Sequence, residues 1–415
     1  MHNFIRHYEC TLCHQTFLPN KEWMTCPTCG EKGILDIIFD YDLIKKVLTK
    51  DRLAKDKDPS MFRYWPLLTV TDTKKAMLTI GGTPLYRSTH LAQCLDVDTL
   101  YLKDESVNPS GSLKDRASAI AVLKALEIQA TAVACSSTGN AASSLACHAA
   151  RMGLKSYIFV PERAPIGKLN QLLIYGANVF LVQGDYQQTF ALSKQAIDAY
   201  GWYNRNAAIN PHLVEGKKTV ALEIAEQLHF RPTDWVIVSV GDGCTLAGLY
   251  KGFYDFKALG LIDNIPKLLG VQSDGCSPLV DAFHFNKPFV PANENTLADS
   301  ISVGIPRNPN KALNAIKASL GSWIKVSDQE ILEAMSLLGR TEGLFGEPAS
   351  VASIAGLKKA RQTGLISRGD SVTVVLTGHG LKDPKNAQLA TTKPQAIAHD
   401  FTEFKRHIKE GGHHV

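Results

Sequence analysis

Residues 235–240 read WVIVSV and residues 241–248 read GDGCTLAG. The first run is apolar and mostly β-branched, which is typical of a strand covered on both faces. The glycines that follow permit a sharp turn, and a helical pattern begins at about Leu246. A strand that passes through a glycine turn into a helix is the repeating step of a parallel α/β fold.

The same step recurs along the chain from about residue 80. Short apolar runs bounded by glycine or proline alternate with alanine- and leucine-rich stretches of helical period. Ligands of such folds bind beyond the carboxyl ends of the strands, so the loops after these runs are the candidate site. The segment from about 41 to 80 is expected to mix helix and loop. The expected strands are 131–136, 156–160, 178–182, 235–240, 268–272 and 371–376.

Composition excludes several classes of protein. The 415 residues are 20% charged and 45% hydrophobic, which argues against disorder. The formal net charge of +5 is too small to require a nucleic-acid or membrane partner. No apolar run is long enough to cross a membrane, and the first residues lack the apolar core of a signal peptide. We therefore expect a cytoplasmic protein.

Four cysteines form two close pairs near the N-terminus. Cys10 and Cys13, and then Cys26 and Cys29, are separated by two residues each, with twelve residues between the pairs. Two tight turns at this spacing present four thiolates to one tetrahedral ion. We predict a structural zinc ribbon within residues 1–45, because four thiolates leave no open position for chemistry. The alternatives are thiols packed without metal and a nucleic-acid-binding ribbon, which the near-neutral local charge disfavours.

Two of the loops that follow strands have the composition of anion sites. In the turn at residues 241–245, glycines let backbone N–H groups converge at a helix N-terminus. No Lys or Arg lies between residues 241 and 250, so main-chain donors would hold a phosphate there. Residues 136–140 (SSTGN) form a second turn, which suits a carboxylate or a phosphate. Taken singly, each pattern also fits an ordinary strand-to-helix turn.

A third loop, residues 108–116, contains a lysine. Lys114 falls at the expected start of a helix, where the dipole disfavours a cation and a desolvated amine is a nucleophile. A lone lysine is usually a solvated surface residue. Beside two anion sites, however, a lysine able to form a Schiff base specifies an aldehyde cofactor that carries its own phosphate, pyridoxal phosphate.

Together these loops resemble the motifs of the threonine synthases, a family of fold type II pyridoxal-phosphate enzymes. The motifs occur in the family's order, and the similarity spans about residues 60–384. The N-terminal ribbon is similar to one carried by part of the family. The motifs are GGTPL at 81–85, SGSLKDR at 110–116, SSTGNAAS at 136–143, EGKKTVALEIAEQL at 215–228, DWVIVSVGDG at 234–243, GDGCTLAG at 241–248, EPASVASIAGL at 347–357 and LTGHGLKDP at 376–384.

The resemblance assigns roles around the cofactor. Lys114 is implied to form the internal aldimine and to shuttle protons at the substrate carbons. Asn140 is implied to bind the ring hydroxyl, and Thr377 to face the pyridine nitrogen. A threonine hydroxyl cannot fix a proton on that nitrogen as a carboxylate would. The residues implied to hold the cofactor phosphate are Gly241, Asp242, Gly243, Cys244 and Thr245.

The resemblance also implies a substrate, O-phospho-L-homoserine, which the family converts with water to L-threonine and phosphate. The reaction removes protons from Cα and Cβ, expels the γ-phosphate and adds water at Cβ. Ser137, Thr138 and Gly139 are implied to receive the substrate carboxylate or its phosphate, and Lys168 is a candidate phosphate contact.

Three departures from the family pattern keep other substrates open. Residues 297–306 read LADSISVGIP where many members have an AIxIG stretch, Leu113 replaces the usual Phe, and GDGC replaces GNGG. The first departure lies near the substrate in this fold. The alternative is a related β-replacement or β-elimination enzyme, such as a cysteate synthase or a diaminopropionate or threonine ammonia-lyase. A regulatory protein with an idle site would lack the cofactor absorbance.

The family fold implies two open parallel-sheet domains with the cofactor in their cleft. The large pyridoxal-phosphate-binding domain is expected at residues 46–118 and 216–390, and the small mobile domain at 119–215. Closure of the small domain would exclude water during the reaction. Residues 391–415 are expected to form a tail. Homodimers are common in this fold.

Overall fold

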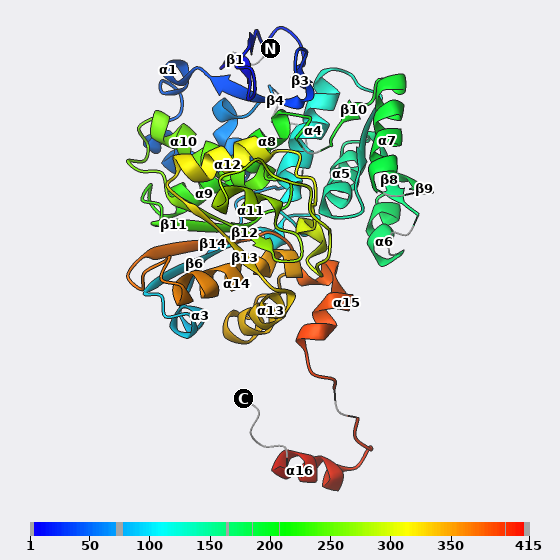
Figure 1. The fold of residues 1–415 in the computed structure, drawn as a ribbon, viewed down its shortest axis with the longest axis vertical. Helices are drawn as coiled ribbons and strands as arrows, with labels where there is room; N and C mark the ends of the chain where they lie inside the picture. Colours follow the sequence, from blue (N-terminus) through cyan, green and yellow to red (C-terminus); the bar gives the residue numbers. More distant parts are fainter. Residues whose placement is uncertain are drawn as a thin grey trace.

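The computed structural model describes residues 4–71, 78–162, 166–184, 186–206, 208–394 and 396–410. These residues form three sheets, and Figure 1 shows helices around the two larger ones. The short sheet at the N-terminus is antiparallel, in the order β2-β1-β4-β3. Its strands are β1 (Ile5–Cys10), β2 (Thr16–Phe17), β3 (Thr25–Cys26) and β4 (Gly30–Phe39).

The largest sheet has the strand order β13-β12-β11-β14-β6-β5 and is parallel except for the edge strand β5. Its strands are β5 (Leu85–Ser88), β6 (Thr99–Asp104), β11 (Trp235–Ser239), β12 (Lys267–Ser273), β13 (Ser322–Val326) and β14 (Ser371–Leu376). Side chains of β11 alternate between two cores. Val236 and Val238 pack on one face, and Trp235 and Ile237 on the other. Helices therefore cover both faces of the sheet.

The helices on these two faces come from different parts of the chain. One face is covered by α9 (Thr219–Gln227), α10 (Cys244–Ala258), α11 (Pro278–His284) and α12 (Pro309–Ala318). The other is covered by α3 (His90–Cys94), α13 (Asp328–Glu342) and α14 (Pro348–Gln362). Residues 41–80 contain α1 (Tyr41–Ile44), α2 (Lys50–Lys55) and the 3-10 helix η1 (Met61–Leu67), as the expected mixture of helix and loop.

A smaller parallel sheet, in the order β10-β7-β8-β9, lies beside the large one (Figure 1). Its strands are β7 (Ala132–Ser136), β8 (Lys155–Pro161), β9 (Asn178–Val182) and β10 (Tyr203–Asn204). The surrounding helices are α4 (Lys114–Glu127), α5 (Asn140–Arg151), α6 (Ile166–Ile174), α7 (Tyr186–Tyr200) and α8 (His212–Lys217). The sheet falls within the predicted small domain, although α4 crosses the predicted boundary at residue 118. The domain limits remain predictions.

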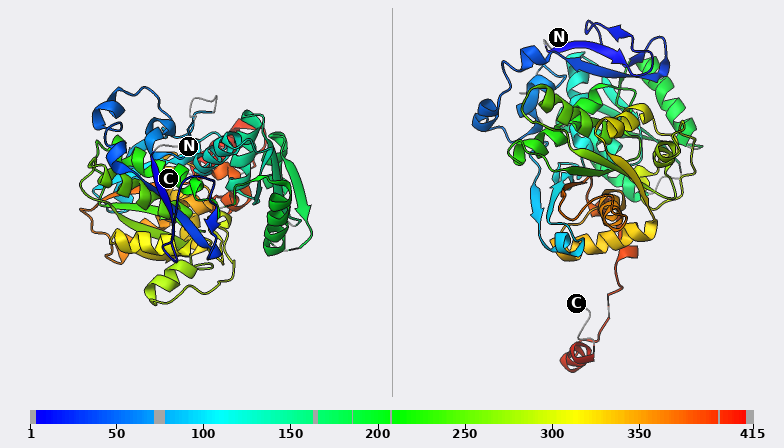
Figure 2. Two further views of the ribbon diagram at one scale, coloured as in Figure 1. Left: turned by 90° about the horizontal axis from the view of Figure 1, so that it is seen from above. Right: turned by 60° about the vertical axis from the view of Figure 1, so that its left-hand side comes forward.

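The predicted strands are confirmed to within a residue, and the 178–182 and 371–376 runs match at both ends. The helix predicted from about Leu246 begins two residues earlier, at Cys244. The predicted tail contains α16 (Phe401–Glu410). Before it lie α15 (Pro384–Ala387) and the 3-10 helix η5 (Gln388–Ala390). Figure 2 shows the N-terminal sheet at one end of the molecule and α16 beyond the other.

Candidate active site

A cavity of about 330 Å³ lies where the helices that follow strands of the two parallel sheets begin. Its lining contains every predicted cofactor and substrate residue except Lys168, whose side chain lies outside the described residues. The predicted residues that line it are Lys114, Ser137, Thr138, Gly139, Asn140, Gly241, Asp242, Gly243, Cys244, Thr245 and Thr377.

Lys114 is the first residue of α4, and the loop before it is held against the loop after β14. The Leu113 N–H donates to the Thr377 carbonyl at 2.9 Å, and the His379 N–H donates to the Gly111 carbonyl at 3.0 Å. Gly111 has a φ of 83°, a conformation that glycine adopts without strain. These bonds place the lysine beside the residue predicted to face the pyridine nitrogen.

Burial lowers the pKa of Lys114 to about 8, and the nearby charges of Lys217 and Arg205 act in the same direction. A substantial fraction of the amine is therefore neutral near pH 8. A neutral amine is both a nucleophile toward an aldehyde and a base. The lysine thus has the ionisation that a Schiff-base residue requires.

The two residues after Lys114 fix the start of α4 through buried charges. The Asp115 carboxylate accepts from His148 Nε2 at 2.8 Å and from the Ser110 N–H at 2.9 Å. The Arg116 guanidinium forms ion pairs with Glu105 and Glu223 at 2.7 and 2.6 Å. Such paired buried groups hold one backbone geometry, since breaking a pair leaves an uncompensated charge. The sequence indicated the lysine, whereas these flanking contacts were missed.

The glycine turn after β11 leaves its backbone donors at the N-terminus of α10. Gly243 has a φ of 89°, and a Cβ there would lie 2.7 Å from the Asn308 carbonyl oxygen and 2.8 Å from the Ala312 Cβ. Glycine is therefore required by both conformation and space. The first N–H groups of a helix have no partner within the helix and attract an anion. The turn fits a phosphate group such as that of pyridoxal phosphate.

A second helix N-terminus, that of α5, reaches the same cavity. It is preceded by Ser137, Thr138 and Gly139, as the sequence predicted. Asn140 is buried, and its amide donates to the Glu347 carboxylate at 2.7 Å. The amide predicted to bind the cofactor's ring hydroxyl therefore has a protein partner in this structure, at the edge of the cavity.

An adjoining cavity of about 480 Å³ shares the 138–140 turn with the first. Lys382 lines this cavity, and its ammonium donates to Ser143 at 3.1 Å and to Gln171 at 2.9 Å. The loop after β14 is thereby connected to α5 and α6 of the small sheet. This lysine belongs to the quoted motif at 376–384, but no sequence pattern distinguished it from the other residues of the motif.

Several lining residues were not predicted from the sequence. Residues 299–303, from the stretch in which the chain departs from the family pattern, line the cavity directly. Arg205, which follows β10, and Lys217, which ends α8, are buried and also face it. Burial lowers the pKa of each. Both come from segments far from the turns in sequence, which is why no local pattern indicated them.

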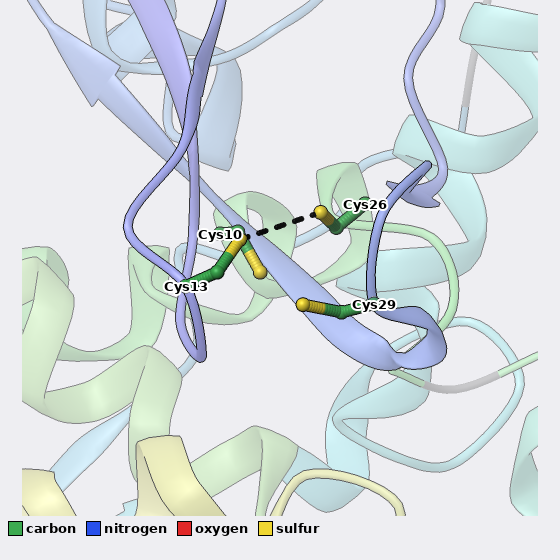
Figure 3. A group of neighbouring side chains, drawn as sticks. All are labelled: Cys10, Cys13, Cys26 and Cys29. Carbon is green, nitrogen blue, oxygen red and sulfur yellow. Dashed lines mark hydrogen bonds between the residues drawn. The ribbon is translucent and has the colours of Figure 1, made fainter.

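The four N-terminal cysteines converge on one point (Figure 3). Their sulfur atoms all lie within 4.8 Å of one another, and Cys13 Sγ is 3.7 Å from Cys26 Sγ. A tetrahedral ion with metal–sulfur bonds of about 2.3 Å needs sulfurs about 3.8 Å apart. The four thiols therefore fit a tetrahedral metal ion. A Cβ at Gly33 would lie 2.6 Å from the Cβ atoms of Cys26 and Cys29, so a side chain there would displace them.

The sheet that carries the cysteines, here called the ribbon (residues 4–39), contacts the helices that begin at the cavity. Asp36 on β4 lies 3.4 Å from Lys251 of α10 and 2.7 Å from Lys311 of α12. Glu22 lies 2.6 Å from Lys124 of α4 and 2.9 Å from His212 of α8. Ile34 packs in one buried cluster with Cys244, the last residue but one of the glycine turn. The ribbon thus contacts the glycine turn.

Among the described residues no helix has the length and apolarity needed to span a membrane.

Comparison with known proteins gives concordant results. Residues 76–378 match the family model described as "Pyridoxal-phosphate dependent enzyme". The chain is 42% identical over 406 residues to a threonine synthase of Methanocaldococcus jannaschii, covering 97% of this chain and 99% of the relative. It is 38% identical over 394 residues to a threonine synthase of Methanosarcina acetivorans, covering 94% and 96% of the two chains.

Solved structures share the fold at lower identity. Maize serine racemase superposes with a TM-score of 0.64 at 19% identity, over 80% of this chain and 94% of that one. Threonine deaminase isoform 2 from Solanum lycopersicum, in its processed form, superposes with a TM-score of 0.63 at 20% identity, over 74% and 87% of the two chains. These structures are similar in fold alone, while the two sequence relatives match over 97% and 94% of this chain.

Proposed function

Because this chain belongs to the pyridoxal-phosphate-dependent enzymes and, within them, to the threonine synthases, we propose that it converts O-phospho-L-homoserine and water to L-threonine and phosphate. The observation that carries the proposal is the position of Lys114. A half-buried lysine with a pKa of about 8 lies in one cavity with two helix N-termini that favour anions. A cofactor phosphate and an anionic amino acid would occupy such a site together.

The residues of the cavity fit the cofactor. Lys114 would bind its aldehyde, and the N–H groups of residues 241–245 its phosphate. Asn140 would bind the ring hydroxyl and Thr377 would face the ring nitrogen, as a neutral partner that leaves the nitrogen free to lose its proton. When bound, pyridoxal phosphate supplies an electron sink that stabilises negative charge at the substrate's α-carbon.

The protein's own part in the reaction is to bind, orient and move protons. Lys114 is the base positioned to take protons from Cα and then Cβ, and its lowered pKa keeps the amine available near pH 8. The turn at Ser137, Thr138 and Gly139 would hold the substrate carboxylate at the N-terminus of α5. Lys114 and the bound substrate carboxylate would both be fixed at helix ends. This positioning contributes to the rate by reducing the motions that the reacting groups need.

The direct test is to incubate the purified protein, loaded with pyridoxal phosphate, with O-phospho-L-homoserine. We expect equal amounts of phosphate and threonine to be released. Phosphoserine, threonine and diaminopropionate serve as competing substrates under the same conditions. Turnover of one of these, without turnover of O-phospho-L-homoserine, would replace the proposal by the related β-replacement or β-elimination enzyme.

We propose further that the ribbon holds zinc, since four thiolates at tetrahedral spacing suit this ion. Metal analysis of protein purified under reducing conditions should give one zinc per chain. Iron in its place would contradict the assignment.

Closure of a small domain at residues 119–215 is also a proposal. It is supported by the bonds of Lys382 to Ser143 and Gln171, which lie between the loop after β14 and the helices of the small sheet. Crystals with and without substrate should differ in the distances from Lys382 to Ser143 and Gln171. A homodimer, which is common in this fold, remains a proposal to be checked by light scattering. A cytoplasmic location, expected from the sequence composition, remains a proposal to be checked by cell fractionation.

A further inference from the structure

Two cations in the cavity have no acidic partner among the described residues. Arg205 is 1% exposed, and its Nε donates to the Ser118 hydroxyl at 3.0 Å. Its Nη2 is buried without a hydrogen-bond partner. A guanidinium in such a place is normally paired with a carboxylate or another anion, because burying its charge unpaired is costly.

Lys217 is in the same situation. It is 2% exposed, and its stem lies against α10, where a Cβ at Gly248 would be 3.1 Å from the Lys217 Cβ. Within the described part of the chain, its ammonium forms no ion pair within 4 Å. The next residue, Lys218, is equally buried but forms ion pairs with Glu215 at 2.5 Å and Asp255 at 2.6 Å.

The carboxylate that acts on both cations does not neutralise them. The Asp242 carboxylate acts to raise the pKa of both Arg205 and Lys217. It also accepts a hydrogen bond from the backbone N–H of Arg307 at 3.3 Å. It lies in no ion pair with either cation. The positive charges also act on each other and on Lys114. The cavity therefore has positive charge that a bound anion would offset.

The position of Arg205 distinguishes between the two anions of the proposed reaction. The glycine turn already offers main-chain donors to the cofactor phosphate at α10. Arg205 approaches from the small sheet, where its N–H donates to the Ala134 carbonyl at 2.9 Å. It also lines a side cavity of about 60 Å³ with Ser136 and Ser137 of the 136–140 turn and with Asp242 of the glycine turn. It is thus associated with the turn expected to receive the substrate.

We propose that Arg205 and Lys217 form the binding subsite for the substrate's phosphate, the group that leaves. This inference rests on the proposed function and identifies residues that determine its specificity. When the Cγ–O bond breaks, its electron pair passes to the bridging oxygen, and the proton removed from Cβ balances the departing phosphate. Negative charge on that oxygen grows as the bond lengthens, so both cations bind the leaving group more strongly than the ester. An uncharged hydroxyl in its place would leave both cations unpaired.

The test compares Arg205→Gln and Lys217→Gln with Arg231→Gln, which removes an exposed arginine outside this cavity. Each protein is studied as the pyridoxal-phosphate-loaded enzyme. For the two cavity variants we expect kcat/KM for O-phospho-L-homoserine to fall about 10- to 100-fold, the loss typical of a charged hydrogen bond. Inorganic phosphate should inhibit the wild type competitively and inhibit these variants far less. The affinity for pyridoxal phosphate should not change, and Arg231→Gln should resemble the wild type throughout.

Thermal unfolding in phosphate-free buffer separates a binding role from a structural one. Removing an unpaired buried charge should leave the midpoint unchanged or raise it, whereas loss of a structural contact lowers it. Should a variant fail to fold, Arg205→Lys and Lys217→Arg keep the charge and should retain phosphate inhibition at reduced strength.

Two outcomes would overturn the subsite. One is an unchanged kcat/KM together with unchanged phosphate inhibition. The other is a weakened affinity for pyridoxal phosphate with the substrate KM unaltered, which would assign the cations to the cofactor. A wild-type enzyme that releases no phosphate from O-phospho-L-homoserine would instead contradict the proposed function, so the two failures are distinguishable.

Discussion

The cysteine cluster and the cavity differ in how much of the chain is needed to form them. The four thiols lie between Cys10 and Cys29, on two turns of one small sheet. The cavity is lined by segments that extend from Lys114 to Thr377 and belong to two other sheets. A site built from neighbouring residues is evident as a spacing in the sequence. A site built from distant segments is evident only as separate motifs, and its remaining members emerge when the chain is folded.

The two regions also differ in chemistry. Four thiolates would complete the coordination of a tetrahedral ion and leave no position for a reactant. The cavity instead contains a lysine with a lowered pKa and two buried cations that have no carboxylate partner among the described residues. Yet the ribbon and the cavity are in contact, because Ile34 of the ribbon packs with Cys244 of the glycine turn. The variants below measure whether the ribbon and the cavity are energetically coupled through this contact.

The largest effect is expected from Lys114→Ala, which tests whether the cavity depends on one amine. We expect the visible absorption of bound pyridoxal phosphate to disappear and kcat to fall at least about 10³-fold, since both the anchor and the base are lost. Lys257→Ala, an exposed residue of α10, is the control and should leave both unchanged. A variant that keeps the absorption band would show that another residue binds the aldehyde.

Metal removal tests whether the ribbon is independent of the cavity. Cys26→Ser, or treatment of the reduced protein with a strong chelator, should lower the free energy of unfolding by about 4 kcal/mol or more, as loss of a structural metal does. Denaturant titration followed by fluorescence measures the change. Because β4 contacts the cofactor turn, the affinity for pyridoxal phosphate should weaken as well. Unchanged affinity in the metal-free protein would mean that the two sites are energetically separate.

Particular residues show what could be predicted from the sequence and why. The run at 371–376 was placed correctly because all but its first and third residues are apolar and the flanking residues Asp370 and Thr377 are polar. Strand β6 was missed because Lys103 and Asp104 interrupt its pattern. Lys103 is nevertheless buried, since its ammonium reaches Glu223 at 2.8 Å, far along the chain. Local periodicity cannot indicate such a partner.

The candidate site followed the same rule. Its glycines and Lys114 lie in motifs whose residue types restrict the backbone and the chemistry, so the sequence indicated them. Arg205 and Lys217 lie among ordinary polar residues, where a cation is usually solvated. Only the folded chain buries them beside the turns. Single cations in unremarkable segments are therefore the part of a distributed site that sequence reasoning misses.

A smaller and more selective effect is expected from Ile34→Ala, which acts on the contact between the two regions. Ile34 is 6% exposed, and truncation of a buried isoleucine costs about 2–5 kcal/mol. Ile37→Ala is a matched control, because Ile37 lies on the same strand but packs in a different buried cluster. Both variants should be destabilised, as measured by denaturant titration. Only Ile34→Ala should also weaken the affinity for pyridoxal phosphate, and equal effects of the two would attribute the change to general instability.

The smallest effect concerns the ionisation of Lys114 in the cofactor-free protein. Its pKa of about 8 lies below the ordinary value of 10.5, so between these limits the unfolded chain binds more protons than the folded one. The contribution of this lysine to stability therefore increases as pH rises from about 8 toward 10.5. The rate of recombination with pyridoxal phosphate should likewise rise through pH 8, because the aldehyde reacts with the neutral amine. Lys217→Gln removes the positive charge that acts most strongly on Lys114 and should move this midpoint to higher pH. An unshifted midpoint would show that this charge does not contribute to it.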